Sequence, residues 1–222
     1  MNKIFLLLIV VLINYGMVQA QEDLIDPRDG QIYKTVKIGN QIWMAQNLNY
    51  ETKDSIFYKE EMLTFMPGKM LPGHFISDSH CYNDSAANCD KYGRLYIWKA
   101  AEKACPVGWH LPSKEEFEIL LSELNYKDAN QFYKILLPGG RSGFNLMLGG
   151  YGQKMSIFTI QQHYLTKDRK SEFWTSSIYK MGRYGFEGYG IGFMSKKVKE
   201  KLKIHTYSVE PIYLFSVRCI KN

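Results

Sequence analysis

The chain has 222 residues, a formal net charge of +6 and 23% charged residues. This length suffices for one domain with a sizeable core, and no linker, low-complexity block or internal repeat divides it. Much of the positive excess lies in one stretch near the C-terminus, residues 196–203. Without a basic helix or a stacking platform, such a local stripe argues against a nucleic-acid-binding protein.

The first 20 residues have the pattern of a signal peptide. A lysine precedes an apolar run, residues 4–13, that is too short to span a bilayer comfortably, and small residues at Val18 and Ala20 fit a cleavage site. We expect the mature chain to begin at Gln21 and to form one domain over 21–222. With no cysteine at its start, a lipid anchor is not expected, and a retained anchor helix would need a longer apolar stretch. The sequence thus predicts an exported protein, in the periplasm, outside the cell or at its surface.

Export changes how the four cysteines are interpreted, because an oxidising space favours disulfides. Three pairings are possible. Cys81 and Cys89 flank a polar, turn-forming stretch that brings its ends together at small entropic cost, which leaves Cys105 for Cys219. The second bridge would close a long loop and stabilise the fold strongly. The alternative, a four-thiolate zinc site, lacks any C-x2-C spacing.

The N-terminal part of the mature chain predicts a β-hairpin. Apolar and polar residues alternate over 31–38, and Gly39-Asn40 makes a two-residue turn into a second strand over 41–45. From 50 to 80 the apolar and polar residues no longer alternate, and two Pro-Gly pairs in that stretch indicate an irregular excursion.

Two short helices are predicted on either side of a Trp-His-Leu-Pro turn. Helical spacing of apolar residues predicts the first over 95–104, ending at Cys105 before a Pro-Val-Gly stop. The second begins at Ser113, which can form a capping box with Glu116. That role makes Glu115 and Glu116 cap and dipole partners rather than an acid/base pair. The apolar face of the second helix comprises Phe117, Leu120, Leu121 and Leu124.

The C-terminal half predicts a β-rich region that packs against the helices. Glycine-punctuated apolar segments predict strands over 144–148, 173–177, 188–193 and 212–220. A further strand or hairpin around 197–205 would place lysines on one face. We call Lys197, Lys199, Lys201 and Lys203 the basic stripe.

Several motifs occur in order along the mature chain. They are the run Asp29–Leu48, the segment from Cys81 to Tyr96 with Tyr92-Gly-Arg-Leu-Tyr96, Cys105-Pro-Val-Gly-Trp-His-Leu-Pro-Ser113, Phe173-Trp-Thr-Ser-Ser177 and Phe215-Ser-Val-Arg-Cys219. Together they resemble the Fibrobacter succinogenes major paralogous domain, and the resemblance covers nearly the whole mature chain. It implies a secreted or surface bacterial α+β domain, similar in fold to C-type lectins and to the formylglycine-generating sulfatase-modifying proteins. Such a fold has a small antiparallel sheet, two short helices and long irregular loops. The resemblance implies no established activity.

The likeness to lectins makes a noncatalytic binding module the first functional hypothesis, with carbohydrate as its candidate ligand. Loops over 141–153 and 181–189 are rich in glycine and aromatic residues and are the expected binding segments. The candidate ligand-binding residues are Arg141, Tyr151, Trp174 and Tyr184. For Trp174, which lies in a strand motif, the alternative is a place in the core.

A calcium-dependent mode of sugar binding is not expected. A hard cation needs clustered oxygen ligands, and the Glu-Pro-Asn triplet of calcium lectins is absent because Ile212 follows Glu210-Pro211. We therefore expect no metal and no other cofactor.

The likeness to sulfatase-modifying proteins raises a second hypothesis, an enzyme. Their oxidative chemistry needs reactive cysteines, and none is left once two disulfides form. The histidines, at positions 74, 80, 110, 163 and 205, show no metal-ligand spacing, and no G-x-S-x-G elbow accompanies them. His110, beside Trp109, is interpreted as a turn-packing residue. We expect no catalytic residues.

The third hypothesis is a structural or adhesive surface protein. In this case the basic stripe would contact an acidic polysaccharide or another protein, and salt would weaken the contact. The alternative is that the lysines only keep an edge strand from pairing with other chains.

Overall fold

A computed structural model describes residues 22–52, 56–57, 75–76, 79–154, 162–182, 185–194, 203–208 and 213–222. The predicted signal peptide lies outside these residues, as does most of the predicted irregular excursion. Within the described ranges, no helix has both the length and the apolar character needed to cross a bilayer.

The described residues contain four α-helices and many short strands. The α-helices are α1 (Ala86–Tyr92), α2 (Trp98–Ala104), α3 (Lys114–Glu123) and α4 (Ala129–Leu136), and a 3-10 turn, Tyr82–Asp84, precedes α1. The short strands of the first half are β1 (Leu24–Ile25), β2 (Ile32–Tyr33), β3 (Thr35–Ile38), β4 (Gln41–Met44), β5 (Ile56–Phe57), β6 (Phe75–Ile76), β7 (Ser79–His80), β8 (Leu95–Tyr96) and β9 (Trp109–His110). The later strands are β10 (Tyr151–Lys154), β11 (Gln162–Leu165), β12 (Lys170–Gly182), β13 (Gly185–Met194), β14 (Lys203–Ser208), β15 (Tyr213–Ser216) and β16 (Ile220–Lys221).

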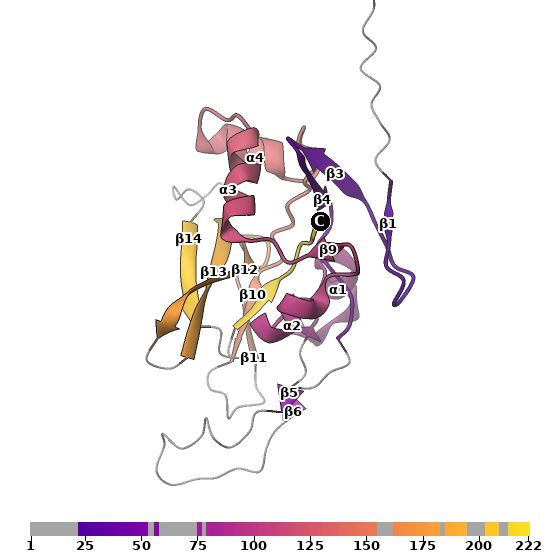
Figure 1. Cartoon of the computed structure of the whole chain (residues 1–222), viewed down its shortest axis with the longest axis vertical. Coiled ribbons are helices and arrows are strands. Elements are labelled where there is room, and N and C mark those ends of the chain that lie inside the picture. The colour runs from indigo at the N-terminus through magenta and orange to yellow at the C-terminus, as the bar shows by residue number, and fades with distance from the viewer. Residues whose placement is uncertain are drawn as a thin grey trace, which may run out of the picture.

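Two sheets organise the molecule (Figure 1). The larger is eight-stranded, with the order β11-β10-β15-β12-β13-β14 and with β8 and β7 branching from β15. The smaller has the order β3-β4-β16-β9, so the chain's last strand lies between the N-terminal hairpin and β9. Pairing is antiparallel except between β12 and β15, which are parallel. The chain is therefore a mixed α and β protein with mainly antiparallel sheets, as the sequence predicted.

The predicted N-terminal hairpin is confirmed, with one difference. Strands β3 and β4 pair in the register Ile38↔Gln41 around the Gly39-Asn40 turn. The predicted strand over 31–38 is divided at Lys34, because β2 pairs with β1 and only β3 pairs with β4. At the division, the backbone N–H of Lys34 donates to the Gln46 side chain (2.9 Å) instead of to a strand.

The predicted strand over 212–220 is two strands in two different sheets. β15 belongs to the large sheet and β16 to the small one, and residues 217–219 connect them. The connection is held from the hairpin side: the Leu48 N–H donates to the Val217 carbonyl (2.8 Å), and the Met44 N–H to the Cys219 carbonyl (3.0 Å). This crossing between sheets buries Arg218 completely.

The prediction of strand over 144–148 is wrong, since no strand forms there. Gly143 and Asn145 both have positive φ, +66° and +52°, which breaks an extended run. The Leu146 N–H donates to the Leu136 carbonyl at the end of α4 (2.7 Å). Phe144 and Leu146 are fully buried, so the apolar pattern reports core packing rather than a strand.

The helix predictions are confirmed for α3 and corrected elsewhere. The helix expected over 95–104 begins at Trp98, because Leu95–Tyr96 pairs as β8 with β15 and β7. Two helices were not predicted. α1 begins inside the small disulfide loop and continues past Cys89 to Tyr92. α4 follows its N-cap, Asp128, whose side chain accepts from the Gln131 N–H (2.9 Å).

Both expected disulfides form, and together they use all four cysteines. Cys81–Cys89 ties the 3-10 turn to α1. Cys105–Cys219 joins the end of α2 to the connection between β15 and β16, across a sequence separation of 114 residues. The long bridge therefore holds the end of α2 next to the segment that carries the buried Arg218.

The capping box predicted at Ser113 is present and gives a direct test of the α3 boundary. The Ser113 hydroxyl accepts from the Glu116 N–H (3.1 Å), and the Glu116 carboxylate accepts from the Ser113 N–H (2.7 Å). We expect Ser113→Ala to lower the free energy of unfolding by about 1 kcal/mol in chemical denaturation. Ser122→Ala, in the same helix but away from its N-terminus, should leave stability nearly unchanged; an equal loss in both variants would contradict the capping role.

Candidate functional site

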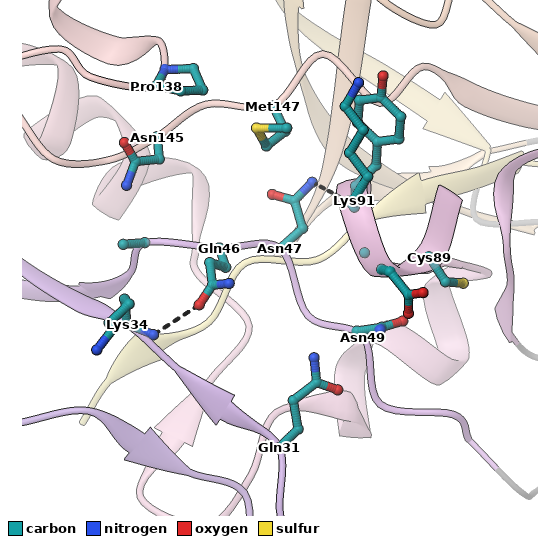
Figure 2. Close-up of a pocket in the computed structure, with 14 residues that line it drawn as sticks. Gln31, Lys34, Gln46, Asn47, Asn49, Cys89, Lys91, Pro138, Asn145 and Met147 are labelled. Carbon is teal, nitrogen blue, oxygen red and sulfur yellow. Dashed lines mark hydrogen bonds between the residues drawn. The ribbon is translucent and has the colours of Figure 1, made fainter. Parts of the chain in front are cut away.

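A polar pocket of about 280 Å³ lies where three segments of the chain meet (Figure 2). The segments are 31–49 from the N-terminal hairpin region, 89–93 at the end of α1, and 138–147 after α4. Five of the fourteen lining residues carry an amide side chain: Gln31, Gln46, Asn47, Asn49 and Asn145. Since an amide offers both a donor and an acceptor, such a lining suits a ligand with several hydroxyl or amide groups.

Asn47 forms the floor of the pocket, and only 5% of its surface is exposed. Its Nδ2 donates to the Tyr92 carbonyl (2.8 Å), and its Oδ1 accepts from Nε of Arg218 (3.1 Å) and from a terminal nitrogen of the same guanidinium. Figure 2 shows this side chain at the centre, between Gln46 and Lys91. Both ends of the amide are thus fixed by protein groups, which sets the shape of the floor.

Arg218 lies directly behind this floor and is fully buried. Besides Asn47, its guanidinium donates to the carbonyls of Phe144 and Asn145, the latter at 3.3 Å, and stacks over the Phe144 ring at 4.3 Å. Burial lowers the pKa of Arg218 to about 9, so the side chain still carries its charge at neutral pH. One buried cation therefore positions two of the pocket's amide residues.

Gly93 allows the C-terminal end of α1 to pack closely against Asn47 at the floor of the pocket. It caps the helix with φ +77° and ψ 179°, a conformation essentially restricted to glycine. A Cβ at this position would stand 2.7 Å from the Asn47 Cβ and 2.8 Å from the Leu48 carbonyl oxygen. The pocket wall from 89 to 93 can approach the hairpin segment only because this side chain is absent.

Asn49 supplies an acceptor that the protein does not use. Within the described part of the chain, its buried Oδ1 has no hydrogen-bond partner, although its backbone N–H donates to the Tyr33 hydroxyl (3.0 Å). A buried acceptor without a donor is unfavourable unless a ligand or water supplies one. The atom is buried beside the cavity, so it can accept from a ligand only if the Asn49 side chain turns towards the cavity.

The charged groups of the lining stand at its exposed rim. Lys34 is paired with Asp23 (2.6 Å), so its charge is largely balanced. Lys91 lies over the Tyr92 ring, with its Nζ 4.8 Å from the ring centroid, and Asp90 precedes it on α1. The charged side chains are therefore exposed to solvent at the edge of the pocket, whereas Asn47 is buried at its floor.

Metal-ligating side chains and thiols do not gather into a site in the described part of the chain. No three His, Cys, Asp or Glu side chains among the described residues converge to hold a metal ion, and both pairs of cysteines are bonded. His110 lies in β9, where its ring nitrogens contact Glu116 (2.9 Å) and the Asn222 side chain (2.7 Å). Its contacts join α3 to the last residue of the chain.

Of the residues predicted to bind ligand, Tyr151 and Trp174 pack on the same core ring, Phe215, whereas Arg141 bonds a different segment. Trp174 is fully buried and donates to the Tyr96 carbonyl (2.7 Å), the core position that the sequence left open. Arg141 donates to the carbonyls of Leu124 and Asn125, and Tyr151 packs against Phe215. Tyr184 lies outside the described residues.

The basic stripe is described in one place only. Lys203 is the first residue of β14, which ends the strand order of the large sheet, and it pairs in register with Gly192. Lys197, Lys199 and Lys201 lie outside the described residues, so the two interpretations of the stripe stay predictions.

The pocket residues were missed as a group, although a signal for them was available. The run Ala45-Gln-Asn-Leu-Asn49 follows a strand and carries three amides within four residues, which is more than a turn needs. The expected loop, 141–153, does contribute Asn145 and Met147 to the pocket. No local pattern could show that 89–93 would complete it.

Comparison with known proteins gives one match, to a family. Neither the curated proteins nor the solved structures contain a match to this chain. A family model described as the Fibrobacter succinogenes major domain matches residues 36–221, which includes all three pocket-forming segments except the start of the first. Because the match extends over most of the sequence, the chain belongs to the Fibrobacter succinogenes major domain family.

Proposed function

We propose that the protein is an exported, noncatalytic binding module with a C-type lectin-like fold, and that its amide-lined pocket holds one saccharide unit. Two features support the fold: the last strand pairs with the N-terminal hairpin, and the long disulfide closes the domain near both. Both disulfides fit the oxidising compartment that export implies.

The observation that carries this proposal is the group of five amide residues around the cavity, together with the unpaired Oδ1 of Asn49 beside it. Sugars present hydroxyl groups that donate and accept at the same time, and an amide such as that of Gln31 can pair with either role. The amide of Asn47 is already bonded at both ends and only shapes the cavity. The volume, about 280 Å³, is near the lower limit for ligand sites and suits a small group rather than a long chain.

Asn49→Ala tests the pocket as the binding site. We expect this change to weaken saccharide binding about tenfold, because one ligand hydroxyl loses its acceptor. A glycan array of the oxidised protein identifies the ligand, and isothermal titration calorimetry then gives the affinities.

Asn130→Ala is the matched control, since Asn130 is an exposed amide residue on α4 outside the pocket. It should bind like the unmodified protein. A blank array would contradict saccharide binding, and full affinity in Asn49→Ala would place the ligand elsewhere on the molecule.

A further inference from the structure

Among the described residues, no carboxylate contacts the buried guanidinium of Arg218. Its hydrogen bonds go to neutral oxygens: the amide oxygen of Asn47 and the carbonyls of Phe144 and Asn145. No ion pair joins it to an acidic residue anywhere in the described ranges. Neutral dipoles satisfy the N–H groups but leave the positive charge itself uncompensated.

The other buried charges among the described residues are paired. The fully buried carboxylate of Asp26 bonds Arg28 at 2.6 Å, and the carboxylate of Glu172, also buried, contacts Lys170. The contrast matters because an unpaired charge in a low-dielectric interior is costly, and its field is weakly screened nearby.

Asn47 and Asn145 separate the positive charge of Arg218 from the pocket, so its electric field extends into the cavity. Asn47 and Asn145 line the pocket on one side and contact the guanidinium on the other. At the rim, Lys91 adds a positive charge that solvent screens, and Asp90 opposes it, whereas Lys34 is balanced by Asp23. Asp168 also acts on Lys91, so the rim charges largely offset one another, and the positive charge that no described carboxylate contacts is that of Arg218.

We infer that the pocket's ligand is an acidic saccharide unit. Its hydroxyl groups pair with the amides, and its anionic substituent is attracted by the positive charge of Arg218. The inference rests on the proposed function and narrows it. The anionic group is a carboxylate, as in a uronic acid, or a sulfate ester. In either form it gains electrostatic stabilisation in the pocket without touching Arg218.

The test is a matched panel of methyl glycosides. Gluco-, galacto- and mannopyranosides are each titrated as the neutral sugar, the uronate and the 6-sulfate, using the oxidised protein and calorimetry. We expect an acidic form to bind about tenfold more tightly than its neutral parent, and the better of the two acidic forms identifies the anion. Equal or weaker binding of both acidic forms overturns the inference and leaves the proposed function standing. No binding by any sugar overturns both.

Two neighbouring rim residues test the charge without disturbing the buried arginine. Asp90→Asn removes a negative charge and should tighten the acidic ligand about threefold, whereas Lys91→Gln should weaken it about threefold. Each change should alter binding of the neutral parent less than it alters binding of the acidic ligand. Lys103→Gln, an exposed lysine of α2 outside the pocket, is the control and should change nothing. Effects of the same size on neutral and acidic ligands would overturn the inference.

Discussion

Replacing Cys105 and Cys219 by alanine is expected to lower the free energy of unfolding by about 4 to 5 kcal/mol. The bridge spans 114 residues of sequence, so its loss releases a large part of the unfolded chain from constraint. Cys219 is also fully buried beside Arg218, where the chain crosses between the two sheets. Equilibrium unfolding in guanidinium chloride measures the loss, and the slope should rise because the unfolded chain becomes less compact without the bridge.

Replacing Cys81 and Cys89 by alanine is the matched control. This bridge spans only eight residues, and the same chain-entropy relation predicts a loss of about 2 to 3 kcal/mol. Loop length therefore predicts a difference of about 2 kcal/mol between the two double variants. If the short bridge proves the more important one, loop closure is not the main contribution of the long bridge.

Gly93→Ala is expected to destabilise the protein by about 3 kcal/mol or more and to abolish ligand binding in the pocket. Two separate effects add here. The backbone at φ +77°, ψ 179° is strained for any residue with a Cβ, and that Cβ would lie 2.7 Å from the Asn47 side chain. To relieve the contact, α1 or the Asn47 segment must move, and both form the pocket. Thermal unfolding and saccharide titration give the two readouts.

Gly30→Ala separates crowding from backbone strain. Gly30 also has a positive φ, +75°, but a Cβ there would meet no atom within 4 Å. We expect a loss of about 1 kcal/mol with ligand binding intact. Should Gly93→Ala show only the same small loss, the close approach of α1 to Asn47 is not what shapes the pocket.

Local signals were sufficient where a short segment satisfies its own hydrogen bonds. The Ser113–Glu116 capping box marks the start of α3 from four residues, and Gly39-Asn40 marks the hairpin turn. A similar signal marks α4, where Asp128 caps the Gln131 N–H and Phe132 and Leu136 lie one turn apart on the buried side. The sequence therefore contains a helix-start signal at Asp128, although the helix was not predicted.

Apolar patterns were insufficient where partners far along the chain decide the conformation. Leu95–Tyr96 has helical spacing with α2, yet it is a strand because β15 and β7 offer backbone partners on both sides. Phe144 and Leu146 alternate like a strand, yet Leu136 and Arg218 take the backbone groups that a neighbouring strand would need.

By itself, the sequence determined the mixed α and β class, the hairpin, the cap of α3 and both cysteine pairs, because each depends on residues close together or on a small set of pairings. Only the tertiary structure decided the pocket and its charge. In the sequence, Arg218 is one residue of a strand motif. In the structure, β15 and β16 belong to different sheets, and the connection between them places Arg218 as a buried cation behind Asn47. Distant segments, 31–49, 89–93 and 138–147, then meet over it, and no local pattern encodes the distance between them.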